Sequence, residues 1–442
     1  NLIFIEQEVL PMELLDRYFQ ISNKGSNIRT ELIAGLATFM TMAYIIVVNP
    51  AILSKGGMDF GSVFVATIAA AFIGTMIMGI WAKWPVALAP GMGLNAFVTF
   101  GVVLGMKQPW EVALGAVFLS GLLFLLLSLT GLREWVINSI PRSLKLGIGA
   151  GIGMFLAIIG LKNAGVVVDN PATFVGLGDF TSLPVILFTI GFIMMIALEK
   201  LRIPGGIVIG IVTISIVGWI MGISEFSGII GPVPSIEPTF LKLDIKSALT
   251  AALIGIVFTL LFVDFFDTAG TLTSVANISG KIDANGKIEN IGRAVASDSI
   301  ATIIGALFGT SNTTSYIESA AGIKEGGRTG LTAVVVAFLF LLCLWFAPLA
   351  KSIPAYATGA ALVFVSTHFM RNMKDIDWDD VSEYSPAVLA AILMPLTFSI
   401  ANGIAIGFIT YALAKAISGR FSEINPAVIL VAVLGILYYV FG

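Results

Sequence analysis

The sequence has few charged residues, one cysteine and one histidine, and each scarcity excludes a class of protein. Charged side chains form 12% of the 442 residues, about half the share of a globular domain, so they cannot cover a water-facing surface. The lone Cys343 excludes an intrachain disulfide and a cysteine metal cluster. The lone His368 argues against a histidine metal site or a catalytic triad. We therefore expect no catalytic residue, no metal and no cofactor.

The sequence is instead rich in apolar residues. They form 57% of the chain, the mean hydropathy is +0.99, and 47 residues are glycine. Long apolar runs must span a membrane as helices, and small residues let such helices pack closely. The net charge of −3 leaves no basic surface for nucleic acid. The composition predicts an all-α, polytopic membrane protein whose surroundings are a lipid bilayer.

Glycine, proline and charged residues divide the chain into fourteen apolar segments and a tail. The first seven segments are about 31–53, 60–82, 86–105, 110–130, 142–163, 182–199 and 204–222. The second seven are about 247–272, 292–309, 311–323, 328–349, 352–370, 385–400 and 402–418. We expect two repeats, 30–223 and 247–420, joined by an extracytoplasmic linker, 224–246, and followed by an apolar tail, 421–442.

Charge sets the expected orientation. With residues 1–29 in the cytoplasm, 18 of the 24 lysines and arginines fall on the cytoplasmic side, as the positive-inside rule requires. This favours a cytoplasmic N-terminus. We expect the protein to lie in the cell's inner membrane. The first methionine is Met12, so we expect residues 1–11 to be foreign to the natural protein.

Seven segments in each half make the second half begin on the opposite side from the first, so an internal repeat must be inverted. The pattern Gly-Ile-x-Ile-Gly-x-x-Thr occurs at 206–213 and again at 403–410, in the seventh and fourteenth segments. The sequence therefore predicts a seven-plus-seven inverted repeat.

The third and tenth segments, which are equivalent in the two halves, are poor membrane helices. In 85–97, Pro85 and Pro90 remove backbone donors and disfavour a helix before them. In 309–322, polar residues stand where a helix would begin. Each segment reads as an extended stretch that runs into a half-helix, with Gly91, Gly93 and Ser315 at the turns. Paired interruptions of this kind indicate a transporter binding site near the midplane, and the alternative is a re-entrant structural kink.

Three acids lie inside apolar segments, where an ionisable group indicates a function. Asp264 and Asp267 are three residues apart on the eighth segment, and Glu318 is in the tenth. Low dielectric opposes ionisation of both aspartates, so one of them is expected to carry a proton. The alternatives are capping or helix-bridging carboxylates, or an aspartate that only orients its neighbour.

Other polar residues are weaker candidates for a functional role. Asn95 offers a donor and an acceptor, so it either reads the edge of a heterocycle or caps backbone. Thr314 and Tyr316 precede Glu318 and are candidate substrate contacts. Asp298, near the start of the ninth segment, is expected to face water or to bridge helices. The run of glycines in 147–153 lacks the setting of a phosphate loop and is typical of a close-packing or sliding helix face.

Five stretches together resemble one family. They are residues 30–45 (TELIAGLATFMTMAYI), 49–50 (NP), 89–96 (APGMGLNA), 264–271 (DFFDTAGT) and 313–322 (TTSYIESAAG). The chain resembles the nucleobase–ascorbate transporter superfamily, in particular its AzgA-like branch of adenine, guanine and hypoxanthine permeases.

The resemblance implies a core domain of segments one to four and eight to eleven, and a gate domain of segments five to seven and twelve to fourteen. It also implies uptake of purine with a proton into the cytoplasm. A homodimer through the gate domain is a separate expectation, which the sequence does not decide. Asp267 or Asp264, with Glu318, match the family's substrate-contacting carboxylates, Asn95 matches its polar position on the third segment, and Tyr316 fits base stacking by analogy.

We expect a purine between the two half-helices, with Glu318 accepting from ring N–H groups and an eighth-segment aspartate holding the coupling proton. The alternative is a sulfate- or bicarbonate-type anion transporter of the same architecture, which three buried acids oppose because carboxylates repel anions. An enzyme is not expected, because no nucleophile–base set is present.

Overall fold

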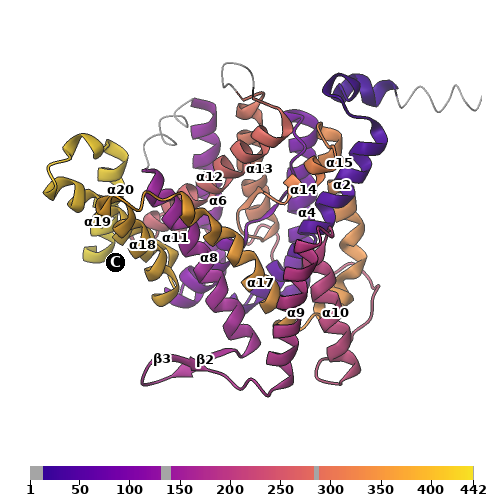
Figure 1. Ribbon diagram of the computed structural model, residues 1–442, viewed down its shortest axis with the longest axis horizontal. Coiled ribbons are helices and arrows are strands. Elements are labelled where there is room, and N and C mark those ends of the chain that lie inside the picture. Colours follow the sequence, from indigo (N-terminus) through magenta and orange to yellow (C-terminus); the bar gives the residue numbers. More distant parts are fainter. Residues whose placement is uncertain (1–12, 131–140, 283–287, 442) are drawn as a thin grey trace, which may run out of the picture.

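The computed structural model describes residues 13–130, 141–282 and 288–441, and helices dominate it (Figure 1). The expectation for residues 1–11 lies outside this part of the chain. In the first half the elements are α2 (Ile28–Met42), α3 (Ile45–Leu53), α4 (Phe60–Ile77), β1 (Leu88–Pro90), α5 (Met92–Ala96), α6 (Trp110–Thr130), α8 (Arg142–Ala164), β2 (Val167–Asn170), β3 (Phe174–Leu177), α9 (Leu183–Lys200) and α10 (Gly206–Ile220).

In its described residues, the second half consists of helices and one short strand. It comprises α11 (Ile245–Ala248), α12 (Ala251–Ser279), α13 (Ile291–Phe308), β4 (Thr313–Ser315), α14 (Ser319–Lys324), α15 (Gly330–Leu342), α16 (Ala347–Ser352), α17 (Ala355–Met370), α18 (Val381–Leu396), α19 (Ile400–Ile417) and α20 (Pro426–Phe441). Two π-helices follow longer helices: η3 (Met78–Ala82) follows α4 and η4 (Phe97–Gly105) follows α5. The 3₁₀ turns are η1 (Ser22–Lys24), η2 (Ser54–Gly56), η5 (Cys343–Phe346), η6 (Arg371–Asp375) and η7 (Phe421–Glu423).

Helix starts follow local capping chemistry. Asn27 accepts a hydrogen bond from the backbone N–H of Thr30 and begins α2, and Asp59 accepts one from Ser62 and begins α4. Ser399 accepts one from Asn402 at the start of α19. Each cap satisfies a donor that the first helical turn leaves free.

Nine helices among the described residues are long and apolar enough to cross a membrane, and Met92–Gly105, Gly206–Ile220 and Val381–Leu396 are shorter apolar helices. On α9, Ile186, Ile190 and Ile193 are 38%, 51% and 58% exposed and share one face. Such a stripe faces lipid rather than water. The multi-pass membrane prediction is confirmed, whereas the fourteen-segment count and the inverted relation stay predictions.

The glycines of α8 let it pack closely against α17 and α18. A Cβ on Gly160 would lie 2.7 Å from the carbonyl oxygen of Gly359 on α17, and one on Gly359 would lie 2.6 Å from that of Gly160. Gly147 faces the backbone of Ala387 on α18 in the same way, whereas Gly149 has open space. The glycine-rich face is thus a close-packing face toward α17 and α18.

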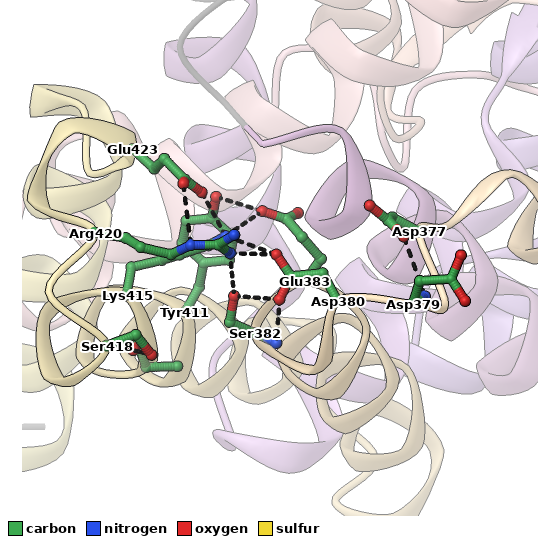
Figure 2. A network of polar contacts seen from close by, with 11 residues as sticks. Asp377, Asp379, Asp380, Ser382, Glu383, Tyr411, Lys415, Ser418, Arg420 and Glu423 are labelled. Carbon is green, nitrogen blue, oxygen red and sulfur yellow. Dashed lines mark hydrogen bonds and ion pairs between the residues drawn. The ribbon is translucent and has the colours of Figure 1, made fainter.

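A buried lysine joins the last helices (Figure 2). Lys415 on α19 is 0% exposed, and its Nζ lies 2.7 Å from Glu383 on α18 and 2.5 Å from Glu423 in η7. Arg420, after α19, is hydrogen-bonded to Asp380, which precedes α18. A buried charge without a partner costs several kcal/mol, so these ion pairs fix α18, α19 and the turn that leads into α20.

Candidate functional site at the crossing of two short strands

The two interrupted segments meet as an antiparallel pair of strands, β1 and β4, and this meeting point is called the crossing. In β1 and β4 the register sets Leu88 opposite Ser315 and Pro90 opposite Thr313. Backbone bonds extend the pair at both ends, from Gly91 N–H to the Asn312 carbonyl at 2.8 Å and from Tyr316 N–H to the Ala87 carbonyl at 3.0 Å. Proline explains the extended backbone of β1, since it disfavours helix in the residue before it.

A short helix follows each strand. Gly91 is the N-cap of α5, and α14 begins directly after Glu318. A Cβ on Gly91 would lie 2.9 Å from Cγ2 of Thr314, so a side chain there would push the strands apart. A Cβ on Gly93 would overlap Ile152 of α8. The two glycines thus permit close approach of the neighbouring elements, and Ser315 is the last residue of β4.

Glu318 lies half-buried beside the crossing. Its Oε1 accepts a hydrogen bond of 2.8 Å from the hydroxyl of Tyr44, which stands at the break between α2 and α3. Asp267, half-buried on α12, is close enough to Asp264 and Glu318 for their charges to act on it. Within the described part of the chain, no hydrogen bond or ion pair joins Asp267. One accessible carboxylate and one braced carboxylate therefore lie together at this point.

Asp264 has different surroundings from Asp267, although the two are one turn apart. It is 1% exposed, and its Oδ2 accepts hydrogen bonds of 2.9 Å from Thr302 of α13 and from Asn312 before β4. The two aspartates therefore have different roles in the structure. Asp264 is buried and binds the segment that leads into β4, whereas Asp267 is partly accessible.

The remaining predicted residues hold the crossing together. Asn95 is fully buried and donates from Nδ2 to Oδ1 of Asn49 at 2.9 Å. The hydroxyls of Thr314 and Thr268 lie 3.0 Å apart. Tyr316 donates to the carbonyl of Pro90. The structure brings all the predicted site residues to this crossing, but it engages Asn95, Thr314 and Tyr316 in protein contacts.

Two open pockets lie away from the crossing. One, of about 370 Å³, is lined by Lys55, Phe100, Lys162 and Phe398 among others, and one of about 560 Å³ lies beside Glu383 and Glu423. Neither contains a predicted site residue.

Sequence reasoning did not single out Tyr44, Asn49 or the role of Asp298. Tyr44 and Asn49 lie in the stretches that carried the family resemblance, which was the available signal. Asp298 was expected to face water or to bridge helices, but it is fully buried and accepts bonds of 2.7 Å from both the N–H and the hydroxyl of Ser315.

Solved structures of low sequence identity share the fold. The transmembrane domain of a cyanobacterial bicarbonate transporter, BicA, matches with a TM-score of 0.63 at 17% identity, covering 85% of this chain and 97% of that one. SLC26A9 matches with a TM-score of 0.64 at 12% identity, covering 93% of this chain and 70% of that one. At these identities the likeness concerns the fold alone.

Sequence relatives match along nearly the whole chain. The putative permease MJ0326 of Methanocaldococcus jannaschii is 50% identical, with 97% of this chain and 99% of that one covered. The adenine permease AdeP of Escherichia coli is 43% identical (97% and 96% covered), and the guanine/hypoxanthine permease PbuG of Bacillus subtilis is 43% identical (96% and 99% covered). The Permease family model, Xan_ur_permease, matches residues 29–406. The chain with the crossed short strands therefore belongs to this permease family, in agreement with the expected resemblance, and is a transporter rather than an enzyme.

Proposed function

We propose that the protein takes up purine nucleobases (adenine, guanine or hypoxanthine) together with protons across the cell's inner membrane. The names of relatives at 43% identity support the substrate class, since they are adenine and guanine/hypoxanthine permeases. The observation that carries the proposal is the pairing of Glu318, braced by Tyr44, with the nearby Asp267 at the strand crossing.

The chemistry of a purine fits these groups. A purine presents ring N–H donors, which a carboxylate accepts in charge-assisted hydrogen bonds. In the proposal, Glu318 accepts from the ring and Asp267 provides a second acceptor. Asn95, Thr314 and Tyr316 become substrate contacts only where their present partners, Asn49, Thr268 and Pro90, release them.

Alternating access requires two bodies that move against each other. The proposed core contains segments one to four and eight to eleven, and the proposed gate contains segments five to seven and twelve to fourteen, in an inverted repeat of fourteen segments. Tight packing of α8 with α17 and α18 supports a gate that moves as a unit. A cytoplasmic N-terminus and a homodimer through the gate complete the proposal.

Anion transport is the second candidate, because BicA carries the name of a bicarbonate transporter and shares the fold. Carboxylates at the crossing oppose it, since an anion would meet Glu318 and Asp267 in a medium of low dielectric.

The test is uptake into liposomes that contain the purified protein. Labelled adenine, guanine and hypoxanthine are supplied with an inward proton gradient, and uracil, xanthine, sulfate and bicarbonate serve as competitors. We expect purine accumulation that collapses with the gradient, and its loss in Glu318→Gln but not in Glu325→Gln, whose carboxylate is exposed at the end of α14. Sulfate or bicarbonate uptake without purine uptake would establish the anion alternative.

A further inference from the structure

Asp298 is a buried carboxyl group to which the proposed purine site assigns no role. It lies on α13, is 0% exposed, and accepts two hydrogen bonds from Ser315 through Oδ2 alone. Its Oδ1 is buried and has no hydrogen-bond partner among the described residues. A buried acceptor without a hydrogen bond costs free energy inside a membrane protein. This indicates that Oδ1 gains a partner at some stage of the transport cycle.

Asp264 reaches the same strand from α12. Its Oδ2 accepts from Asn312 and Thr302, and its Oδ1 is likewise buried without a donor in the described part of the chain. Thr302 stands one helical turn after Asp298 and also contacts the backbone of Thr313 at 3.1 and 3.2 Å. The two carboxyl groups therefore hold the two ends of β4, and they are close enough for the charge of Asp264 to act on Asp298.

Apart from Asp267, which lies close enough to Asp264 for their charges to interact, the groups that face this pair are neutral. From α12 comes Thr268, from the strand come Ser315 and Thr313, and from α6 comes Ser120, which accepts from Asn312. The charged group acting on Asp298 is Asp264, and in the described residues neither acid forms an ion pair with lysine, arginine or histidine. Two carboxylates without a cation in such a medium do not both stay ionised, and one proton shared by the pair resolves the conflict.

We propose, on the basis of the proposed purine–proton symport, that Asp264 and Asp298 together hold the coupling proton behind β4. The proton comes from water on the outer side, bonds to one carboxyl oxygen, and is released to water on the cytoplasmic side as the transport cycle ends. The covalent bond that is made and broken is that O–H bond. Protonation weakens the acceptor that holds Ser315 or Asn312. Because Glu318 lies three residues after Ser315, a change in β4 is transmitted to the purine-binding carboxylate.

The experiment separates purine movement from proton coupling in liposomes. One assay follows exchange of labelled adenine or hypoxanthine between equal internal and external pools, and the other follows accumulation driven by a proton gradient with a pH-sensitive dye inside. We expect Asp298→Asn to retain exchange and to lose both accumulation and base-dependent acidification. Asp169→Asn, which changes an exposed acid of the β2–β3 hairpin, should keep all three.

Accumulation by Asp298→Asn with the wild-type ratio of protons to base would overturn the inference. The inference would also be overturned if a sodium gradient drove accumulation in the wild type and Asp298→Asn lost it, since the pair would then bind sodium. Absence of purine exchange in the wild type would instead reject the proposed function. If Asp298→Asn does not fold, Thr302→Val removes one donor to Asp264 and keeps both acids. It should then shift the pH dependence of accumulation, and an unchanged pH profile would count against the pair.

Discussion

At the scale of single residues, the phenol of Tyr44 fixes the direction of the Glu318 carboxylate. A hydrogen bond to a charged acceptor contributes about 1.5–3 kcal/mol, and here it also orients the group. Without it, Glu318 can turn away from a ligand at the crossing. Tyr44 is therefore a positioning residue in the proposed site.

We expect Tyr44→Phe to weaken purine binding by about ten- to a hundredfold, as loss of one charge-assisted hydrogen bond predicts. Purine affinity, measured by the ligand-dependent rise in melting temperature, checks this. Tyr384→Phe, on α18, is the matched control. Wild-type affinity in Tyr44→Phe would show that Glu318 needs no orientation by Tyr44.

Asn95 illustrates a buried polar chain. It donates to Asn49, which donates in turn to Thr67 and Thr310 at 2.7 and 2.8 Å. We expect Asn95→Leu to destabilise the purified protein by about 1–3 kcal/mol, because Oδ1 of Asn49 loses its donor. The measurement is the shift in melting temperature without ligand. A stable variant that no longer transports would instead favour a direct contact between Asn95 and the purine.

The sequence predicted those site residues that are charged and lie inside apolar segments. Asp264, Asp267 and Glu318 interrupt apolar segments, so the cost of burying them was evident from the letters. Tyr44 gave no such signal, because a phenol is uncharged at neutral pH. The bond from Ser315 to Asp298 depends on how α13 packs against β4, and no local pattern encodes that packing.

At the scale of elements, the spacing of β1 and β4 depends on Gly91 facing the methyl group of Thr314. We expect Gly91→Ala to lower the melting temperature and slow uptake. Adding Thr314→Ser should restore much of both, because serine lacks the methyl group but keeps the hydroxyl that contacts Thr268. No rescue in the double variant would contradict steric contact as the cause.

The ion-pair cluster between α18 and α19 predicts a dependence on acid. Hydrogen bonds from Ser382 and Arg420 hold the pKa of the Asp380 carboxyl well below its usual range. A lowered pKa adds stability that is complete above the ordinary value of 3.8 and is lost as the pH falls below it. Asp380→Asn should therefore lower the melting temperature at pH 7 and have a smaller effect in acid. An equal effect at every pH would show that the charge is not involved.

Elements were predictable to different degrees. The two interrupted segments followed from proline, glycine and polar residues, and both contain the expected strand and half-helix. The π-helices η3 and η4 were not predicted, since apolar periodicity does not distinguish one extra residue per turn in a helix that is apolar all round. The eighth segment was expected to end near residue 272, but α12 continues to Ser279. Its last turns contain weak helix formers, and burial of Val275 and Ala276 in the core stabilises them instead.

At the scale of the whole molecule, close helix packing depends on glycines, which have no side chain to separate the backbones. Gly160 and Gly359 bring α8 and α17 into backbone contact, whereas Gly149 of α8 has open space. We expect Gly160→Ala to lower the melting temperature. Gly149→Ala should leave it unchanged or raise it, because alanine favours helix by about 0.5–1 kcal/mol over glycine. Equal effects of the two changes would argue against close approach as the role of Gly160.

Composition alone predicted a membrane protein, because a chain so poor in charge has no other stable surroundings. The arrangement of the helices was not predictable in the same way. It depends on contacts between α8 and α17, or β1 and β4, which are distant in sequence. The family resemblance implied a core domain and a gate domain, which stay predictions. Chains at 17% and 12% identity with the same fold show how little of the arrangement any particular side chain specifies.

The bonds that join β1 to β4 run between main-chain atoms. Main-chain donors and acceptors are the same in every amino acid other than proline, so substitutions that add no bulk between the strands, unlike one at Gly91, leave these bonds in place. A side chain beside the strands can therefore change, and with it the chemistry offered to a ligand, while the two interrupted segments stay joined.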